Sequence, residues 1–267
     1  MDFQLFKEIK IKGLFVKMVI TLFLGIVIMI LSKLCKIAIT DNYIEVISFV
    51  ITTVWFLLVV EFIKKNNIHL SSFVKKPSKR GFIFEIPVTL IVTYIGGIGV
   101  ILLMLFLVNY INPNILSSLQ SKMVDRPHDI DTTFIKCISF AAAVIAAPVT
   151  EEYIFRGILM NRLYNKYGMG KSIIFSSLIF LMVHMTPNPI LLFLGISCAV
   201  LVYKYKSLIP AILLHALNNL ITFIRNLSST VSQGNDLTVN SSFLVLGIIL
   251  LIIYVLYAYI NYRKYKI

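Results

Sequence analysis

The sequence predicts an all-α, polytopic membrane protein with about eight transmembrane helices. Two compositional observations support this prediction: apolar residues make up 58% of the 267 residues, and charged residues only 14%. Soluble domains are typically about 45–50% apolar and about 25% charged. The mean hydropathy of +0.90 points the same way. The composition therefore excludes a soluble globular domain.

Long apolar stretches are the third observation. Crossing a hydrocarbon core of about 30 Å takes about 20 helical residues, each rising about 1.5 Å. Stretches of roughly this kind predict eight spans, which are Phe15–Leu34, Ile44–Ile63, Phe84–Val108, Phe134–Arg162, Ser172–Met185, Ile190–Tyr203, Leu208–Ile224 and Phe243–Ile260.

The first span begins after basic residues and looks like a secretory signal sequence. However, the following LSKLCKIAIT lacks a small-x-small cleavage site, so we expect the span to be retained. The longest polar connections, around 64–81 and 112–133, are too short to enclose a soluble core. We therefore expect residues 1–267 to form a single integral membrane domain.

Small residues in the spans indicate packing. The cluster Gly96, Gly97 and Gly99 in the third span is typical of close helix contact. The three cysteines are isolated and lack CxxC spacing, so they predict neither a disulfide framework nor a cysteine zinc site. We expect them to be small packing residues.

The net charge of +13 comes from basic residues that gather in alternate connections between the spans. The positive-inside rule assigns these connections to the cytoplasm. The outer segments hold few basic residues, and the one long outer loop carries Asp125, Asp129 and Asp131 beside Lys122 and Arg126. The distribution predicts a multi-pass cell-membrane protein with both termini cytoplasmic. It is explained by the anionic inner leaflet of the lipid bilayer, so nucleic acid is not an expected partner.

An acidic pair, Glu151 and Glu152, lies inside the fourth span, in AAPVTEEYIFRGILMNRL. A carboxylate in hydrocarbon is costly unless it has a partner, so the pair indicates a functional site. On a helix Glu152 and Arg156 share a face, whereas Glu151 is rotated by about 100°. Glu152 can therefore be neutralised while Glu151 stays available. The alternative is that the acids only pair structurally with Arg156 and a neighbouring helix.

Two histidines, His184 and His215, lie inside the fifth and seventh predicted spans. Asn219 follows His215 by four residues, so both share one helix face. Counted from the predicted cytoplasmic ends at about 1.5 Å per residue, these three residues and Glu151 lie roughly 13 to 20 Å deep. Three helices thus bring polar groups to one layer.

A carboxylate, two imidazoles and an amide suit the hydrolysis of a peptide bond. Glu151 could take a proton from water and pass it to the leaving amine, with His184 orienting that water. His215 and Asn219 could donate hydrogen bonds to the oxyanion. Equally, Glu151, His184 and His215 could hold a divalent metal such as zinc. The sequence leaves both mechanisms open, with a metal cofactor and without one.

Three ordered motifs resemble those of the intramembrane CAAX-processing and bacteriocin-processing endopeptidase family. The resemblance covers about residues 134–225. The matching residues are Glu151-Glu152-x-x-x-Arg156, Phe180-x-x-x-His184 and His215-x-x-x-Asn219.

This resemblance implies a multi-helix membrane protease. Glu151 and His184 would activate water, and His215 with Asn219 would stabilise the oxyanion. The remaining motif residues, Phe180 among them, would support the site. The family is commonly called a metallopeptidase although its metal is disputed, which matches the two mechanisms left open above.

Other protease chemistries have less support. All six aspartates lie outside the predicted spans, which excludes an aspartyl dyad, and no HExxH motif is present. Gly195-Ile196-Ser197 with His215 faintly matches a rhomboid-like serine protease but leaves the acidic pair unexplained. A transporter is a further class, since intramembrane acids also serve proton coupling, but no inverted repeat is apparent.

The expected substrate is a short peptide precursor or the C-terminal tail of a membrane-associated protein. Nothing in the sequence indicates a prenyl pocket. Usage rich in Ile, Lys and Asn is typical of an AT-rich bacterial genome, where bacteriocin or pheromone precursors, or self-immunity, are the expected roles. The alternative function is a non-catalytic membrane immunity or scaffold protein that binds a bacteriocin-like peptide.

Overall fold

The computed structural model describes residues 3, 5–77, 81–115, 133–228 and 239–264, and every regular element in these ranges is helical. The prediction of an all-α membrane fold is therefore confirmed. The elements are α1 (Lys12–Leu34), α2 (Asp41–Lys65), η1 (Leu70–Ser72), α3 (Phe82–Ile111), α5 (Thr133–Phe140), η2 (Ala141–Ala146), α6 (Ala147–Glu152), η3 (Tyr153–Leu159), α7 (Met160–Tyr167), α8 (Met169–Val183), α9 (Pro189–Tyr205), α10 (Ile209–Ser228) and α11 (Ser241–Arg263).

Each predicted span corresponds to a helical segment, but not all of these segments can cross a bilayer. Within the described residues, five are long and apolar enough: α1, α2, α3, the continuous rod of α5 to α7, and α11. Helices α8 and α9 have only 15 and 17 residues. At about 1.5 Å per residue, α8 rises roughly 22 Å, less than a hydrocarbon core of about 30 Å. The eight predicted segments therefore correspond to five helices of full spanning length and three further helices, α8, α9 and α10, in the centre of the bundle.

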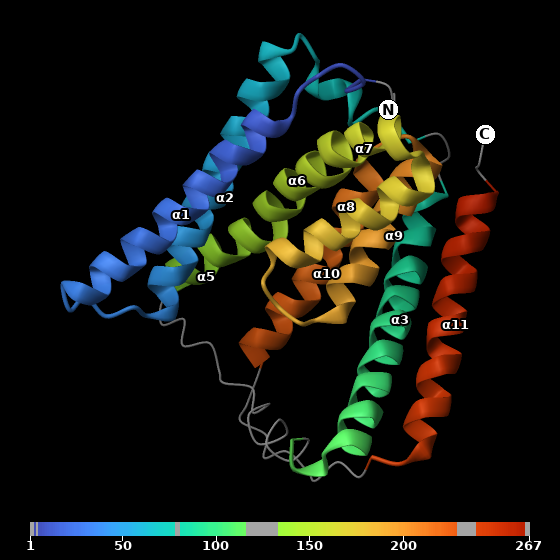
Figure 1. The fold of residues 1–267 in the computed structure, drawn as a ribbon. Helices are drawn as coiled ribbons and strands as arrows, with labels where there is room; N and C mark the ends of the chain where they lie inside the picture. The colour runs from blue at the N-terminus through green and yellow to red at the C-terminus, as the bar shows by residue number, and fades with distance from the viewer. Residues whose placement is uncertain (1–2, 4, 78–80, 116–132, 229–238, 265–267) are drawn as a thin grey trace.

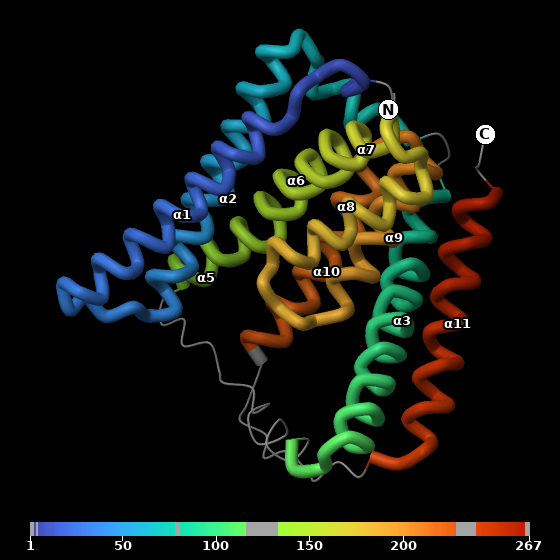
Figure 2. Tube along the Cα trace, viewed as in Figure 1, coloured from blue at the N-terminus to red at the C-terminus, as the bar shows by residue number. Residues whose placement is uncertain are grey.

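The helices form three groups (Figure 1). The antiparallel α1–α2 hairpin lies on one side, and the antiparallel α3–α11 pair lies on the other. The Cα trace in Figure 2 shows α8, α9 and α10 between these groups, next to the oblique rod of α5 to α7. Helix α9 packs against α3, α8 and α10, so the short helices form the centre of the bundle. Helix α1 begins and α11 ends at the same end of the molecule.

Glycines allow the outer helices to pack closely. A Cβ on Gly99 would lie 3.0 Å from the carbonyl oxygen of Gly247, and one on Gly247 would lie 2.9 Å from that of Gly99. The two backbones of α3 and α11 therefore meet directly, as the glycine cluster predicts. In the hairpin, a Cβ on Gly25 of α1 would lie 2.7 Å from Cδ1 of Ile51 in α2.

The fourth predicted span is interrupted by two π-helical segments, η2 and η3, on either side of α6. In η2 the N–H of Ala147 bonds the carbonyl of Ala142, five residues back. Pro148 has no N–H to offer the next carbonyl. The uniform helix expected from hydropathy was therefore wrong in detail, because apolar composition carries no signal for a change of hydrogen-bond register. Wide turns of this kind occur often at functional sites.

Two other expectations have partial outcomes. Cys198 is buried in α9, whereas Cys35 and Cys137 are exposed, so the packing role holds only for Cys198. The predicted outer loop, with its three aspartates, lies outside the described residues.

Candidate active site

The motif residues come from three parts of the bundle. Glu151 and Glu152 end α6, and Arg156 lies in η3 immediately after them. His215 and Asn219 lie in α10. These elements surround the centre of the bundle, where η2, α6 and α9 all pack against α10.

His184 does not lie inside a helix as expected. It is the C-cap of α8, and the next residue, Met185, has a φ of 49°, so the chain turns there. Pro189 and its capping neighbour Asn188 then start α9. Because α8 is short, this turn falls within the thickness of a bilayer if α8 starts at one surface. The predicted span ended at Met185, two residues beyond the last residue of α8, and hydropathy therefore placed His184 inside the helix.

The structure brings the four predicted catalytic side chains around one cavity. Glu151, His184, His215 and Asn219 all line a cavity of about 340 Å³. Oε2 of Glu151 lies 3.7 Å from Nε2 of His184 and 3.8 Å from Nε2 of His215. These separations are too long for direct hydrogen bonds, and Oε2 is buried without a hydrogen-bond partner. Oε2 of Glu151 therefore lies beside both imidazole nitrogens without bonding either one.

Glu152 is neutralised, as its spacing from Arg156 predicts. Nη1 of Arg156 donates to Oε1 of Glu152 over 2.8 Å, and both side chains are fully buried. Nη2 of Arg156 donates to the carbonyl of Gly195 in α9 over 3.0 Å. The guanidinium carbon also lies 4.6 Å from the ring centroid of the buried Phe180. The arginine therefore joins η3, α8 and α9 beneath the site.

In each histidine, the hydrogen-bond partner of Nδ1 determines which ring nitrogen carries the hydrogen. Nδ1 of His215 lies 3.0 Å from Oε1 of Glu152, and Nδ1 of His184 lies 2.8 Å from the carbonyl oxygen of Phe180. An ionised carboxylate and a carbonyl only accept hydrogen bonds, so both Nδ1 atoms carry the hydrogen. In their neutral forms both rings thus present Nε2 to Glu151 as an acceptor.

The two carboxylates of the motif have different surroundings. Glu152 is bonded by the guanidinium of Arg156. Glu151 makes no such bond, and its Oε2 lies beside the two imidazoles.

Two residues that sequence analysis did not single out, Asn218 and Tyr94, help to hold the side chain of Asn219. Its Nδ2 donates to the carbonyl of Ala143 over 2.8 Å, and its Oδ1 accepts from Nδ2 of Asn218 over 3.1 Å. Tyr94 of α3 in turn donates to Oδ1 of Asn218 over 3.1 Å. An amide nitrogen has two N–H groups, so the second one of Asn219 is left for a substrate oxygen. The Asn-Asn pair in HALNNL was a usable signal for Asn218, but Tyr94 had none.

The proposed metal ligands do not form a ready metal site. Two ligands of a tetrahedral zinc ion lie about 3.3 Å apart when each is about 2.0 Å from the metal. The nitrogen–oxygen separations in this site are 3.7 and 3.8 Å. Among the described residues, no group of three His, Cys, Asp or Glu side chains has a geometry suited to a metal. Glu151, His184 and His215 therefore do not fit zinc as they stand.

The serine alternative is not supported by the contacts of Ser197. Its hydroxyl lies 2.7 Å from that of Thr93 in α3 and 3.2 Å from that of Tyr254 in α11. These bonds join three helices at a buried interface. Ser197 therefore ties α9 to α3 and α11, and in the described part of the chain its hydroxyl bonds Thr93 and Tyr254 rather than His215.

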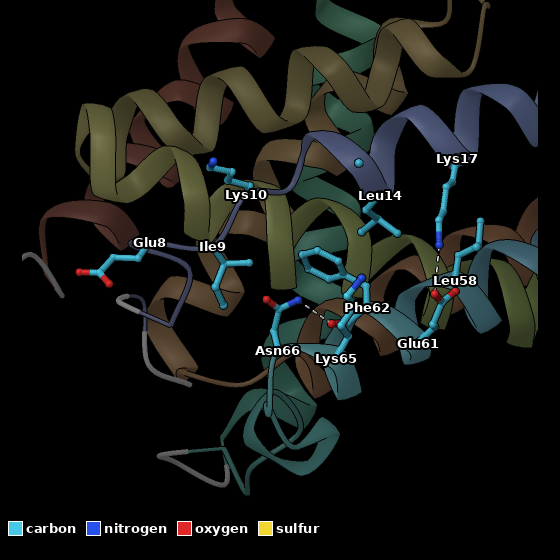
Figure 3. Close-up of a pocket in the computed structure, with 11 residues that line it drawn as sticks. Glu8, Ile9, Lys10, Leu14, Lys17, Leu58, Glu61, Phe62, Lys65 and Asn66 are labelled. Atoms are coloured by element: carbon cyan, nitrogen blue, oxygen red, sulfur yellow. Dashed lines mark hydrogen bonds and ion pairs between the residues drawn. The ribbon is translucent and has the colours of Figure 1, made fainter.

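A larger cavity, of about 540 Å³, lies away from this site, between the N-terminal segment and the α1–α2 hairpin (Figure 3). Its charged lining includes the ion pair of Lys17 with Glu61, 3.0 Å apart, and its floor includes Leu58 and Phe62. No histidine lines it. The larger of the two cavities is therefore not the one that contains the histidines suited to acid–base chemistry.

Residues 133–221 match a family model described as "Type II CAAX prenyl endopeptidase Rce1-like". The matched segment contains all seven motif residues. Neither the curated proteins nor the solved structures gave a match. At the level of the family, the match supports a CAAX-type intramembrane endopeptidase. Over residues 133–221, the chain is therefore similar to the Rce1-like CAAX endopeptidase family, which is the family that its motifs resemble.

Proposed function

We propose that this protein is an intramembrane endopeptidase that uses water activated by Glu151 and His184. Its substrate is a short peptide precursor or the C-terminal tail of a membrane-associated protein. The observation that carries the proposal is the buried, unpartnered Oε2 of Glu151, which lies within 3.8 Å of two imidazole nitrogens on a cavity of about 340 Å³.

In the first step, a water molecule between Glu151 and His184 loses a proton to Oε2 of Glu151. The hydroxide attacks the carbonyl carbon of the scissile bond and forms a tetrahedral oxyanion. The free N–H of Asn219 donates a hydrogen bond to this oxyanion. His215 can donate from Nε2 only when it carries both ring protons, and the carboxylate of Glu152 at Nδ1 is then its counter-ion.

In the second step, Glu151 returns its proton to the nitrogen of the leaving amine. The carbon–nitrogen bond breaks, and the products are a carboxylic acid and an amine. One residue thus serves as base and then as acid, and the cluster ends in the charge state in which it began. Both steps are written with the side chains of Glu151, His184, His215 and Asn219 alone.

We further propose that the protein lies in the cell membrane with both termini cytoplasmic. The basic residues of the alternate connections support this orientation. Helix α1 begins at the end of the molecule where α11 ends, as an even number of crossings requires (Figure 1). The substrate then reaches the site from the cytoplasmic side or laterally from the lipid.

The test is mass spectrometry of candidate precursor peptides and prenylated or unprenylated tail peptides incubated with purified protein. Cleavage by the wild type, its loss in Glu151→Gln and its survival in a chelator are the expected results. Glu61→Gln is the matched control, because Glu61 is exposed, pairs with Lys17 and does not line the cavity of about 340 Å³. A protein that binds a peptide but cleaves none, with wild type and Glu151→Gln behaving alike, would instead be an immunity or scaffold protein.

A further inference from the structure

The cavity of about 540 Å³ in Figure 3, called here the hairpin-end cavity, lies where α1 begins and α2 ends. Gly13 and Lys17 of α1 line it, together with Glu61 and Lys65 of α2 and residues 8–10 before α1. Both helices are long and apolar enough to cross a membrane, so their paired ends fall at the level of the lipid headgroups of one leaflet. The volume lies in the range of about 300–1,000 Å³ that small-molecule sites have.

The N-terminal wall of this cavity is held in place by the protein itself. Nη1 of Arg162 in α7 donates to the carbonyl oxygen of Phe6 over 3.1 Å, and Nδ2 of Asn165 donates to that of Phe3 over 2.9 Å. The ring of Phe6 is fully buried, and its centroid lies 6.3 Å from that of Phe62 in α2. The cavity is therefore formed by two anchored parts of the chain and does not depend on a ligand to exist.

The charged lining of the cavity favours an anion. Three lysines and two glutamates line it, and Lys17 is paired with Glu61 over 3.0 Å at one edge. Lys10 and Lys65 are exposed, and neither is in an ion pair among the described residues. Together with Glu8 they leave a net charge of +1, which a ligand with one negative charge would balance. Lysine is a common binder of phosphate groups, as a point charge.

The apolar lining shows that the ligand is more than a free anion. Leu14 and Leu58 form part of the cavity wall. On α1, Ile20 and Leu24 continue the helix face of Lys17 away from the cavity, and they are 52% and 53% exposed. An acyl chain can lie along this face while its polar head occupies the cavity. Inorganic phosphate would leave the apolar wall uncovered, so an amphiphile fits the site better.

We propose that the hairpin-end cavity binds one anionic phospholipid of the phosphatidylglycerol class. The phosphodiester contacts Lys10 and Lys65, and a glycerol hydroxyl donates to the carboxylate of Glu8. The first part of an acyl chain covers Leu14 and Leu58. This inference goes beyond the proposed function, because no residue that lines the hairpin-end cavity lines the cavity at Glu151.

The probe is dioleoylphosphatidylglycerol, added to the purified protein in dodecyl maltoside at 0.15 M salt, with bound lipid counted by native mass spectrometry. This ionic strength screens attraction beyond about 8 Å. The expected result is one saturable lipid with a Kd at least about tenfold lower than that of dioleoylphosphatidylethanolamine, which has the same phosphate but no net charge. Equal affinity for the two lipids would overturn the inference.

The headgroup without its acyl chains separates a lipid site from a phosphate site. Glycerophosphoglycerol and inorganic phosphate should displace the lipid only at concentrations at least about a hundredfold above that of the lipid, because neither covers the apolar wall. Displacement by either one at a concentration equal to that of the lipid would show a site for free phosphate, and the assignment to a phospholipid would be wrong.

Two pairs of neighbouring lysines provide matched variants. Lys10→Gln combined with Lys65→Gln should raise the Kd at least about tenfold, because each basic residue near an anionic lipid contributes on the order of fivefold. Lys12→Gln combined with Lys64→Gln is the control, since both lysines are exposed and neither lines the cavity. The control removes the same charge and should change the Kd less than about threefold. Equal losses would reduce the effect to general attraction and contradict a defined site.

A steric pair of variants tests the same placement without changing charge. A Cβ on Gly13 meets nothing within 4 Å, so Gly13→Phe should fit the fold while its ring occupies the cavity, and the Kd should rise at least about tenfold. Val19→Phe is the control, because Val19 lies on the opposite face of α1 and is 65% exposed. It should change the Kd less than about twofold. Unaltered binding by Gly13→Phe would mean that the lipid lies elsewhere.

Discussion

Asn219 donates a hydrogen bond from Nδ2 to the main-chain carbonyl oxygen of Ala143, 2.8 Å away. This carbonyl lies in η2, where the N–H of Ala147 bonds Ala142 and where Pro148 has no N–H. The side chain of Asn219 in α10 thus supplies the carbonyl of Ala143 with a hydrogen-bond donor that the π-helical segment η2 does not supply. The bond lies about two turns before Glu151 and ties the helix that carries Glu151 to the helix that carries His215.

Removal of this amide should destabilise the protein. Asn219→Ala leaves the part-buried carbonyl of Ala143 without its donor, and a typical intramolecular hydrogen bond contributes about 0.5–1.5 kcal/mol. Pro148→Ala restores an N–H in the same turn and should reduce that cost. A double-mutant cycle on unfolding free energies, measured in mixed micelles, checks this: we expect a coupling between the two sites of at least about 0.5 kcal/mol. Strictly additive effects would show that the proline and Asn219 do not share the carbonyl.

Arg156→Ala should be among the most damaging substitutions in the chain. It leaves Glu152 fully buried without its counter-ion, and breaking a buried pair in this way costs about 3–5 kcal/mol. Arg156→Lys should not restore stability, because one ammonium does not reproduce the planar fork that bonds both Glu152 and the Gly195 carbonyl. Thermal unfolding in detergent gives the ranking. A stable, monodisperse Arg156→Ala protein would show that the pair has little structural importance.

Gly247→Ala should separate α3 from α11. The added Cβ would lie 2.9 Å from the carbonyl oxygen of Gly99, a backbone atom that cannot move aside, so we expect a loss of about 1–3 kcal/mol. Gly13→Ala is the control, because a Cβ at Gly13 of α1 meets nothing within 4 Å and should stabilise its helix by up to about 1 kcal/mol. Unfolding midpoints of the two variants test the contact. A tolerated Gly247→Ala would mean that the two helices pack less closely.

His184→Ala should separate activity from stability. The side chain is 27% exposed and lies at a helix end, so its removal should cost less than about 1 kcal/mol of stability. If its Nε2 orients the attacking water, kcat should fall by about 10²–10⁴. Steady-state kinetics on a cleaved peptide, with unfolding midpoints measured in parallel, test both statements. Unchanged kcat would remove His184 from the mechanism.

The parts of the fold that sequence could predict are those with a local physical signal. Apolar runs predicted all eight helical segments to within a few residues, because the cost of unpaired backbone in hydrocarbon forces such runs to be helical. The i, i+4 spacing predicted the ion pair of Glu152 with Arg156. The Gly96–Gly99 cluster predicted close contact, although its partner Gly247 could not be named, since that depends on how distant helices pair.

The features that sequence could not predict depend on non-local contacts. Hydropathy cannot show where α8 ends within an apolar run, so the position of His184 at the turn was missed. The roles of Asn218 and Tyr94 arise only when α3 and α10 meet. The hairpin-end cavity likewise exists only because the N-terminal segment packs beside the end of α2.

The most direct test of the central claim is the single-turnover rate of Glu151→Gln on a peptide that the wild type cleaves. The substitution nearly preserves the shape of the side chain but removes the atom that takes the proton. If Glu151 is the base, the rate should fall by about 10²–10⁴ while the peptide Kd stays within about twofold. A rate within about tenfold of the wild type would contradict the account, because the cavity would then hydrolyse peptides without its acid.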